Sequence, residues 1–280
     1  MALKPPENLA RLRAWPGDAD VAVALTFDVD AESAWLGEGP EYERRLTTLS
    51  QAGYGPVRGL GRILDLLDAH DITSTFYVPG HTADHYPDSV SEIIERGHEV
   101  GHHGYLHRGT DGLDAGRQRA ELEQGLEALA RLGVRPHGYR SPSWELTPET
   151  LAFLGEMGFS YESSMMRDDR PYWVDAGGRP LLELPGHWSL DDWPFFGYTA
   201  YQGGLLADPQ SVERIWLEEF ASAQAEDGRL VTYTMHPEVI GRGYCLRMLE
   251  RIIVAMRDHG RPWFTTHAEI AALAEPAGSG

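Results

Sequence analysis

Two acids at the end of an apolar run are the residues of this sequence best placed to do chemistry. Asp28 and Asp30 follow residues 21–27, whose side chains are almost all apolar and predict a buried strand. A carboxylate at the edge of a core needs a charged or hydrogen-bonding partner. Side chains two positions apart on a strand point the same way, so we expect both carboxylates to project into one space.

Two histidines further along the chain are suited to bind a metal ion in that space. His103 and His107 are four residues apart, a spacing that places both imidazoles on one face of a helical turn. With a carboxylate as third ligand, one coordination position stays open for water, as in catalytic zinc sites. Such an ion lowers the pKa of bound water from ~15.7 toward ~7 and polarises a carbonyl. The alternative interpretation is a polar, histidine-rich loop without a metal.

The elements that must position these residues alternate along almost the whole chain. Strands are expected at residues 21–27, 73–78, 98–102, 138–140, 159–161, 181–184, 229–235 and 262–266, and helices at 59–70, 87–96, 113–132, 148–157, 211–225 and 246–259. This alternation predicts an α/β fold, a distorted TIM-like (β/α) barrel with seven or eight strands, as one catalytic domain over residues 1–280. A doubly wound open sheet competes, but no glycine-rich dinucleotide fingerprint follows the first strand.

The polar residues fall at one end of these strands. Asp28 and Asp30 follow the first strand and His103 and His107 the third, while Arg140 ends the fourth and His236 ends the strand at 229–235. Because β/α barrels collect catalytic groups at the carboxyl ends of their strands, we expect these six side chains to form one site.

The composition describes a globular chain with an acidic balance. Its 280 residues are 42% hydrophobic and 24% charged, with a formal net charge of −19. That balance argues against binding to nucleic acid or to anionic membranes, which relies on Lys and Arg. Cys245 is the only cysteine, so neither an internal disulfide nor a cysteine cluster for zinc is expected. The amino terminus lacks the pattern of a secretion signal, and no apolar run approaches the ~20 residues that span a bilayer, so a cytoplasmic location is expected.

Four segments resemble, in order, the motifs of the polysaccharide deacetylase superfamily, the carbohydrate esterase type. They are Thr26–Asp30, Gly101–His107, Tyr139–Pro142 and Met235–Pro237, and residues 75–80 are similar to that family's second strand. The resemblance runs from about Val21 to Thr266. It implies a distorted β/α barrel and metal-dependent hydrolysis of amide C–N bonds other than peptide bonds, usually the removal of N-acetyl groups from sugars.

The resemblance also implies a role for each residue. Asp30, His103 and His107 would hold one divalent ion, zinc first, with cobalt, manganese, nickel or iron open. Asp28 would be the general base, oriented by Arg140. His236 would be the general acid, since histidine titrates in the range needed to protonate a leaving amine.

Several positions depart from the family pattern. The acids are Asp-Val-Asp, where adjacent acids are more common, and His102 is a weaker alternative ligand. Asp191, Asp192 and Trp193 are candidates for a further motif, and either acid could be the partner of His236. Glu183 and Glu238 are weaker candidates. These features resemble an intracellular branch with peptidoglycan-deacetylase-like, allantoinase-like and cyclic-imide-hydrolase-like members, so the substrate is an N-acetylated glycan or a small cyclic amide.

The remaining candidates concern substrate and assembly. Trp35, Trp193 and Asp192 are expected to contact substrate. The aromatic side chains of residues 172–204 could form a sugar platform, core or subunit interface, and a homo-oligomer is expected. His267 and six other histidines lack a partner pattern and are expected on the surface or in loops. Two other classes compete: an iron oxygenase with two histidines and one carboxylate, and an inactive binding module.

Overall fold

One sheet organises the computed structural model, which describes residues 15–274. Within these residues the strands are β1 (Val21–Asp28), β2 (Thr75–Val78), β3 (Glu99–His102), β4 (Gly138–Tyr139), β5 (Tyr161–Glu162), β6 (Tyr172–Asp175), β7 (Pro180–Glu183), β8 (Leu230–Met235) and β9 (Pro262–Phe264). Their order is β6-β7-β5-β4-β3-β2-β1-β8, with β9 paired to β1. All pairs are parallel except β6 with β7. The predicted α/β fold is confirmed, and β6 is an unpredicted addition.

Strand β1 lies next to β8 at one end of the sheet order and joins distant parts of the chain. Its eight residues are all buried. On one side residues 22–27 pair with β8, and on the other residues 21–23 pair with β9 and residues 26–28 with β2. Parallel pairing places the carboxyl ends of β1, β2 and β8 at the same edge.

The sheet curls into a barrel that closes incompletely. Its two ends, β6 and β8, do not pair with each other, and loop residues bridge the gap. Asp191 forms a β-bridge with Thr234 of β8, and the N–H of Leu230 donates to the carbonyl of Asp169 over 3.1 Å. This incomplete closure between β6 and β8 agrees with the prediction of a distorted barrel.

Strand β6 is one arm of a hairpin with β7. Gly177 and Gly178 in the connecting turn have φ angles of +67° and +87°, a region that glycine adopts without steric cost. Four residues are too few to show strand periodicity, so only the Gly-Gly pair could have indicated this hairpin from the sequence.

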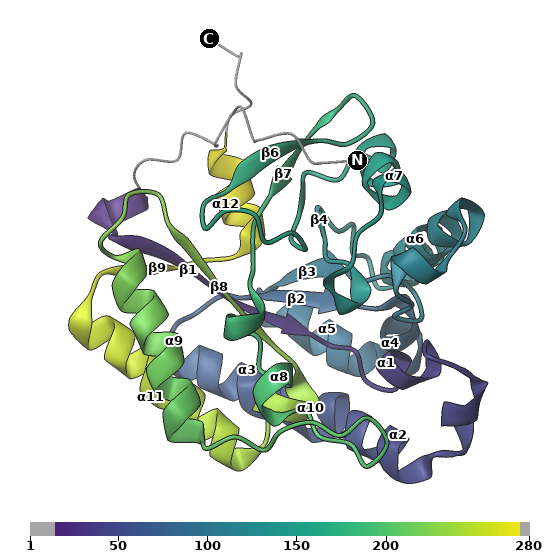
Figure 1. Ribbon diagram of the computed structural model, residues 1–280, viewed down its shortest axis with the longest axis horizontal. Helices are drawn as coiled ribbons and strands as arrows, with labels where there is room; N and C mark the ends of the chain where they lie inside the picture. The colour runs from purple at the N-terminus through teal and green to yellow at the C-terminus, as the bar shows by residue number, and fades with distance from the viewer. Residues whose placement is uncertain (1–14, 275–280) are drawn as a thin grey trace.

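Helices cover the outside of the sheet (Figure 1). The longer ones are α3 (Leu60–Ala69), α5 (Pro87–Glu95), α6 (Ala115–Arg131), α7 (Pro148–Met157), α9 (Pro209–Ala223) and α11 (Gly243–His259), close to the predicted ranges. Shorter ones are α1 (Ser33–Leu36), α2 (Leu46–Ala52), α4 (Gly80–His85), α8 (Trp193–Phe196), α10 (Pro237–Ile240) and α12 (His267–Leu273). Among the helices of residues 15–274, none has the length and apolar character needed to cross a membrane.

Alternation along β1 divides the core into two parts. Val23 and Phe27 face the helix layer and join a cluster that includes Trp216 of α9. Ala22 and Ala24 face the barrel interior, where their small side chains leave room for larger ones from other strands.

His267 contradicts its prediction as a surface or loop histidine. It is fully buried, and its Nδ1 lies 2.6 Å from the hydroxyl of Tyr77. Burial lowers its pKa well below the usual value. It begins α12, which is anchored at the amino-terminal ends of β2 and β3 by bonds from the N–H groups of His267 and Ala268 to Thr75 and Glu99. The imidazole therefore closes the end of the barrel opposite the predicted site.

Candidate active site

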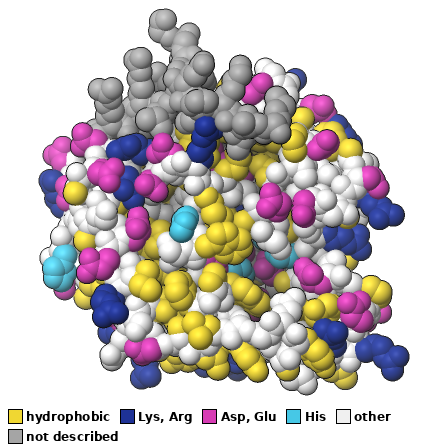
Figure 2. All heavy atoms as spheres, viewed as in Figure 1, with side chains coloured by type: hydrophobic (Ala, Val, Ile, Leu, Met, Phe, Trp, Pro, Cys, Tyr) yellow, Lys and Arg dark blue, Asp and Glu magenta, His cyan; other side chains and the backbone are white. Residues whose placement is uncertain are grey.

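A pocket of about 230 Å³ opens at the carboxyl ends of the central strands. Figure 2 shows apolar side chains around a hollow near the middle of this face, with histidine and acidic atoms visible inside it. Five of the six residues predicted to form one site line this pocket: Asp28, Asp30, His103, His107 and His236. The sixth, Arg140, lies directly behind Asp28.

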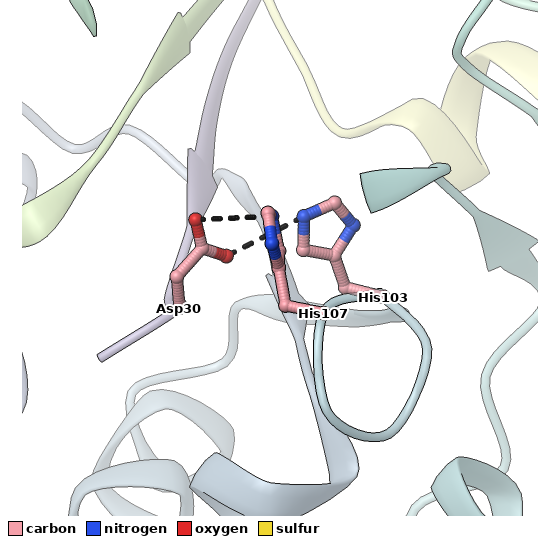
Figure 3. Close-up of side chains that lie close together, drawn as sticks. All are labelled: Asp30, His103 and His107. Atoms are coloured by element: carbon pink, nitrogen blue, oxygen red, sulfur yellow. Dashed lines mark ion pairs between the residues drawn. The ribbon is translucent and has the colours of Figure 1, made fainter. Parts of the chain in front are cut away.

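The carboxylate of Asp30 faces both histidines that were predicted to bind metal (Figure 3). Its Oδ1 lies 3.4 Å from Nε2 of His103, and its Oδ2 lies 3.4 Å from Nε2 of His107. One ligand atom from each residue falls within 4.8 Å of the others, a spacing that can surround a single ion.

The chemistry of these atoms fits a cation. Nδ1 of His103 lies 2.8 Å from the carbonyl oxygen of Arg140, so Nδ1 carries the hydrogen and Nε2 presents a lone pair to Asp30. Among the described residues, Oδ1 of Asp30 is buried without a hydrogen-bond partner. Two electron-pair donors that face each other in a buried site need a positive charge between them.

The backbone that presents these histidines is a loop, so the predicted helical turn is wrong. Residues 103–109 form no helix, and Gly104 and His107 have φ angles of +72° and +53°. His102 faces away because successive side chains leave a strand on opposite sides. Its Nε2 lies 2.9 Å from the carbonyl of Leu122 and its Nδ1 accepts the N–H of Gly104, which removes it as an alternative ligand.

Arg140 fixes Asp28 beside the candidate metal ligands. Its Nη1 donates to Oδ1 of Asp28 over 2.7 Å and to Oγ1 of Thr26 over 2.9 Å. Its Nε and Nη2 donate to Ser163. Burial raises the pKa of Asp28, but Arg140, with His103 and His236, outweighs that effect and holds it below the usual value. Asp28 is thus an ionised carboxylate whose Oδ2 remains available to the pocket.

Asp192 holds His236 on the opposite side of the site. Its Oδ1 accepts from Nδ1 of His236 over 2.7 Å and its Oδ2 from the main-chain N–H over 3.0 Å. Burial disfavours the imidazolium, yet Asp192 and, less strongly, Asp191 and Asp30 raise the pKa of His236 well above the usual value. His236 can therefore present a proton on Nε2, which lies 3.8 Å from Oδ2 of Asp30. Because both Asp192 oxygens face His236, we assign Asp192 to this histidine and not to substrate.

Among the described residues, the other predicted partners make no hydrogen bond to the imidazole of His236. Asp191 Oδ1 is 3.9 Å from the imidazole and bonds to other groups. Glu183 accepts the N–H of Met165. Glu238 is buried, and burial raises its pKa to about 8.

Four tryptophans wall the pocket. Trp35 and Trp193, both predicted from the sequence to contact substrate, lie with ring centroids 5.9 Å apart. Trp144 and Trp188 form another part of the wall, 5.6 Å apart. Trp144 was not foreseen, although its position four residues after Arg140 was an available signal.

Comparison with known proteins places these motifs in a family context. The family model described as polysaccharide deacetylase matches residues 18–161. A peptidoglycan deacetylase from Helicobacter pylori is 29% identical over 281 residues, which covers 90% of this chain and 95% of that protein. The crystal structure of a candidate polysaccharide deacetylase from Mycobacterium smegmatis is 36% identical, with a TM-score of 0.91 over 98% of this chain and 95% of the other. PuuE allantoinase shares the fold, with 24% identity and a TM-score of 0.84 over 97% of each chain.

Proposed function

Because the chain belongs to the polysaccharide deacetylase family, we propose that it hydrolyses a non-peptide amide C–N bond in a metal-dependent reaction. The N-acetyl group of a glycan is the substrate group that we put first. One observation carries the proposal: beside the group of Asp30, His103 and His107, Oδ2 of Asp28 lies 3.8 Å from Nε2 of His103, and Nε2 of His236 lies 3.8 Å from Oδ2 of Asp30.

Asp30, His103 and His107 would hold the ion, and two imidazoles with one carboxylate suit zinc first, with cobalt, manganese, nickel or iron as alternatives. When bound, the ion would polarise the scissile carbonyl and acidify water. In the second acidic group, Asp191 and Asp192 with His236, the carboxylate oxygens already accept from N–H donors, so we assign no ion to it and give the handling of the proton to Asp192 and His236.

The proton path follows from the two flanking pairs. Arg140 occupies Oδ1 of Asp28, so Oδ2 accepts the proton of the attacking water as its oxygen bonds to the carbonyl carbon. Asp192 occupies Nδ1 of His236, so Nε2 donates its proton to the nitrogen as the C–N bond breaks. The products are a carboxylic acid and an amine.

A cyclic imide or ureide is the second candidate substrate. The pocket of about 230 Å³, walled by tryptophans, favours a compact ligand over a long polymer. A screen of N-acetylglucosamine oligomers beside succinimide-like and hydantoin-like rings separates the two classes, because each predicts turnover of only one set.

Metal analysis joined to this screen tests the whole proposal. Turnover that depends on bound metal supports it. Metal-loaded protein that hydrolyses neither set contradicts it, and dioxygen consumption by an iron-loaded form would favour an oxygenase. Bound metal with neither amide hydrolysis nor dioxygen consumption would favour an inactive binding module.

Assembly and location are further parts of the proposal. Exposed apolar side chains, among them Leu46, Tyr201 and Leu206 at 75%, 63% and 67% exposure, support a homo-oligomer, which light scattering would detect. A cytoplasmic location remains a prediction from the sequence that cell fractionation would test.

A further inference from the structure

Asp191 and Asp192 are neighbours in the chain but serve different parts of the pocket. Asp191 is buried, with 1% of its surface exposed. Its Oδ1 accepts the main-chain N–H of Trp193 over 2.8 Å, and its Oδ2 accepts the indole N–H of Trp144 over 3.0 Å. One carboxylate therefore joins two tryptophan residues that line the same pocket.

Trp144 is held in place by more than this bond. Ser143 and Trp144 have φ angles of +55° and +63°, which L-residues rarely adopt unless their surroundings enforce it. A Cβ on Gly186 would lie 2.5 Å from Cη2 and Cζ3 of this indole, so only glycine leaves room for the ring. The left-handed backbone at Trp144, the missing Cβ of Gly186 and the carboxylate of Asp191 together fix the position of the Trp144 indole.

We propose that Asp191 is a positioning residue that sets the space between the Trp144 and Trp193 parts of the pocket wall and so selects which ligands fit. The inference rests on the proposed function in one respect, because the ligand between these walls is taken to be the substrate. It assigns Asp191 to substrate selection and leaves the proton of His236 to Asp192.

Asp191→Asn and Asp192→Asn form a matched pair that separates these assignments. The two N–H groups bond to different oxygens of Asp191, and an amide places an acceptor oxygen at only one of these two positions, so Asp191→Asn loses one bond of the brace. We expect KM to rise about tenfold, the loss of one charge-assisted bond, while the base-side limb of the kcat profile moves less than in Asp192→Asn, because Asp191 acts on the pKa of His236 less strongly than Asp192. Asp192→Asn should instead lower kcat. An unchanged KM in Asp191→Asn would overturn the proposal.

Trp144→Phe removes the indole N–H and keeps an aromatic ring. Its effects on KM and on thermal unfolding should not add to those of Asp191→Asn, because both remove the same bond. Trp173→Phe is the control: among the described residues its indole N–H has no hydrogen-bond partner and it does not line the pocket, so its effect on thermal unfolding should add to that of Asp191→Asn. Additive effects for Trp144→Phe would contradict the brace.

Gly186→Ala displaces the indole without removing a bonding group, and it should also raise KM. The unfolding measurements need no substrate, so they test the brace even if the wild-type protein hydrolyses no amide, which would contradict the proposed function alone. Crystal structures add a direct readout: Trp144 should move in Asp191→Asn and stay in Asp192→Asn. An unmoved indole in Asp191→Asn would reject the proposal.

Discussion

The guanidinium of Arg140 lies 2.7 Å from Oδ1 of Asp28, and both side chains are buried. A buried ion pair of this kind fixes geometry as well as charge, because either partner alone would be an uncompensated charge in the core. It holds one carboxylate ionised and directed into the pocket, beside a second carboxylate that faces two imidazoles.

Replacing Asp28 with Asn should remove the proton acceptor and leave the metal ligands in place. We expect kcat to fall by roughly 10²–10⁴, the usual contribution of a positioned general base, while the metal content stays the same. Rate measurements and elemental analysis of the same sample check both expectations. Asp30→Asn is the matched control and should lose metal; equal metal loss in both variants would contradict the division of roles.

Removal of metal should abolish activity reversibly. Dialysis against a chelator is expected to leave a folded, inactive protein, because the barrel core does not depend on the site. Zinc should restore turnover, and cobalt, manganese, nickel and iron provide the comparison. His103→Ala and His107→Ala should each lower the bound metal well below one equivalent. Full metal occupancy in either variant would exclude that histidine as a ligand.

The base-side limb of the kcat profile should depend on Asp192. His236 must be protonated to donate, so activity should fall as pH rises through its raised pKa. Asp192→Asn removes the strongest interaction that raises this pKa, so the limb should move to lower pH. The profile of kcat against pH measures the shift, and an unmoved limb would mean that another group is the acid.

Glu162 should make stability depend on pH. It is fully buried, and burial raises its pKa to about 8 from 4.5. Between these values the folded protein retains a proton that the unfolded chain has released, so stability should fall as pH rises from 5 to 8, by roughly 3 to 4 kcal/mol.

Denaturant unfolding at pH 5 and pH 8 measures this loss. Glu162→Gln keeps the shape and removes the titration, so its stability should depend less on pH than that of the wild type. Exposed Glu95→Gln is the control and should retain the wild-type dependence. The assignment fails if Glu162→Gln retains it as well.

Arg45 should influence substrate affinity from outside the pocket. Its guanidinium lies between the rings of Tyr42 and Tyr201, 4.1 and 4.0 Å from their centroids. It thereby ties the segment after β1 to the loop that carries pocket residue Gln202. Loss of two cation–π contacts in Arg45→Ala should raise KM about tenfold with little change in kcat. Exposed Arg44→Ala is the control, and equal KM values for the two variants would contradict this role.

The sequence was sufficient to predict which strands collect the reactive residues. Asp28, His103, Arg140 and His236 each follow or end a predicted strand, and parallel pairing brings those ends together whatever the details of the loops. The end of a strand can thus be predicted from a single sequence, because the apolar or alternating pattern of the strand stops there.

Loop conformation and side-chain partners were not predictable in the same way. His107 and Trp144 have left-handed backbone conformations, which a sequence indicates only where the residue is glycine. The sequence therefore predicts a helical turn at His107 and no special conformation at Trp144. His267 was misplaced because its burial depends on Tyr77, which is far away in the sequence. Such features arise from tertiary contacts, which local patterns do not encode.

The two strands on either side of β1 in the sheet, β2 and β8, are synthesised far apart in time. Asp30, His103 and His107 all precede residue 161, whereas Asp192 and His236 come much later. The three proposed metal ligands therefore leave the ribosome well before β8, the strand that pairs with β1 and precedes the proposed proton donor His236. All three proposed metal ligands are therefore present in the nascent chain before the proposed acid has been synthesised.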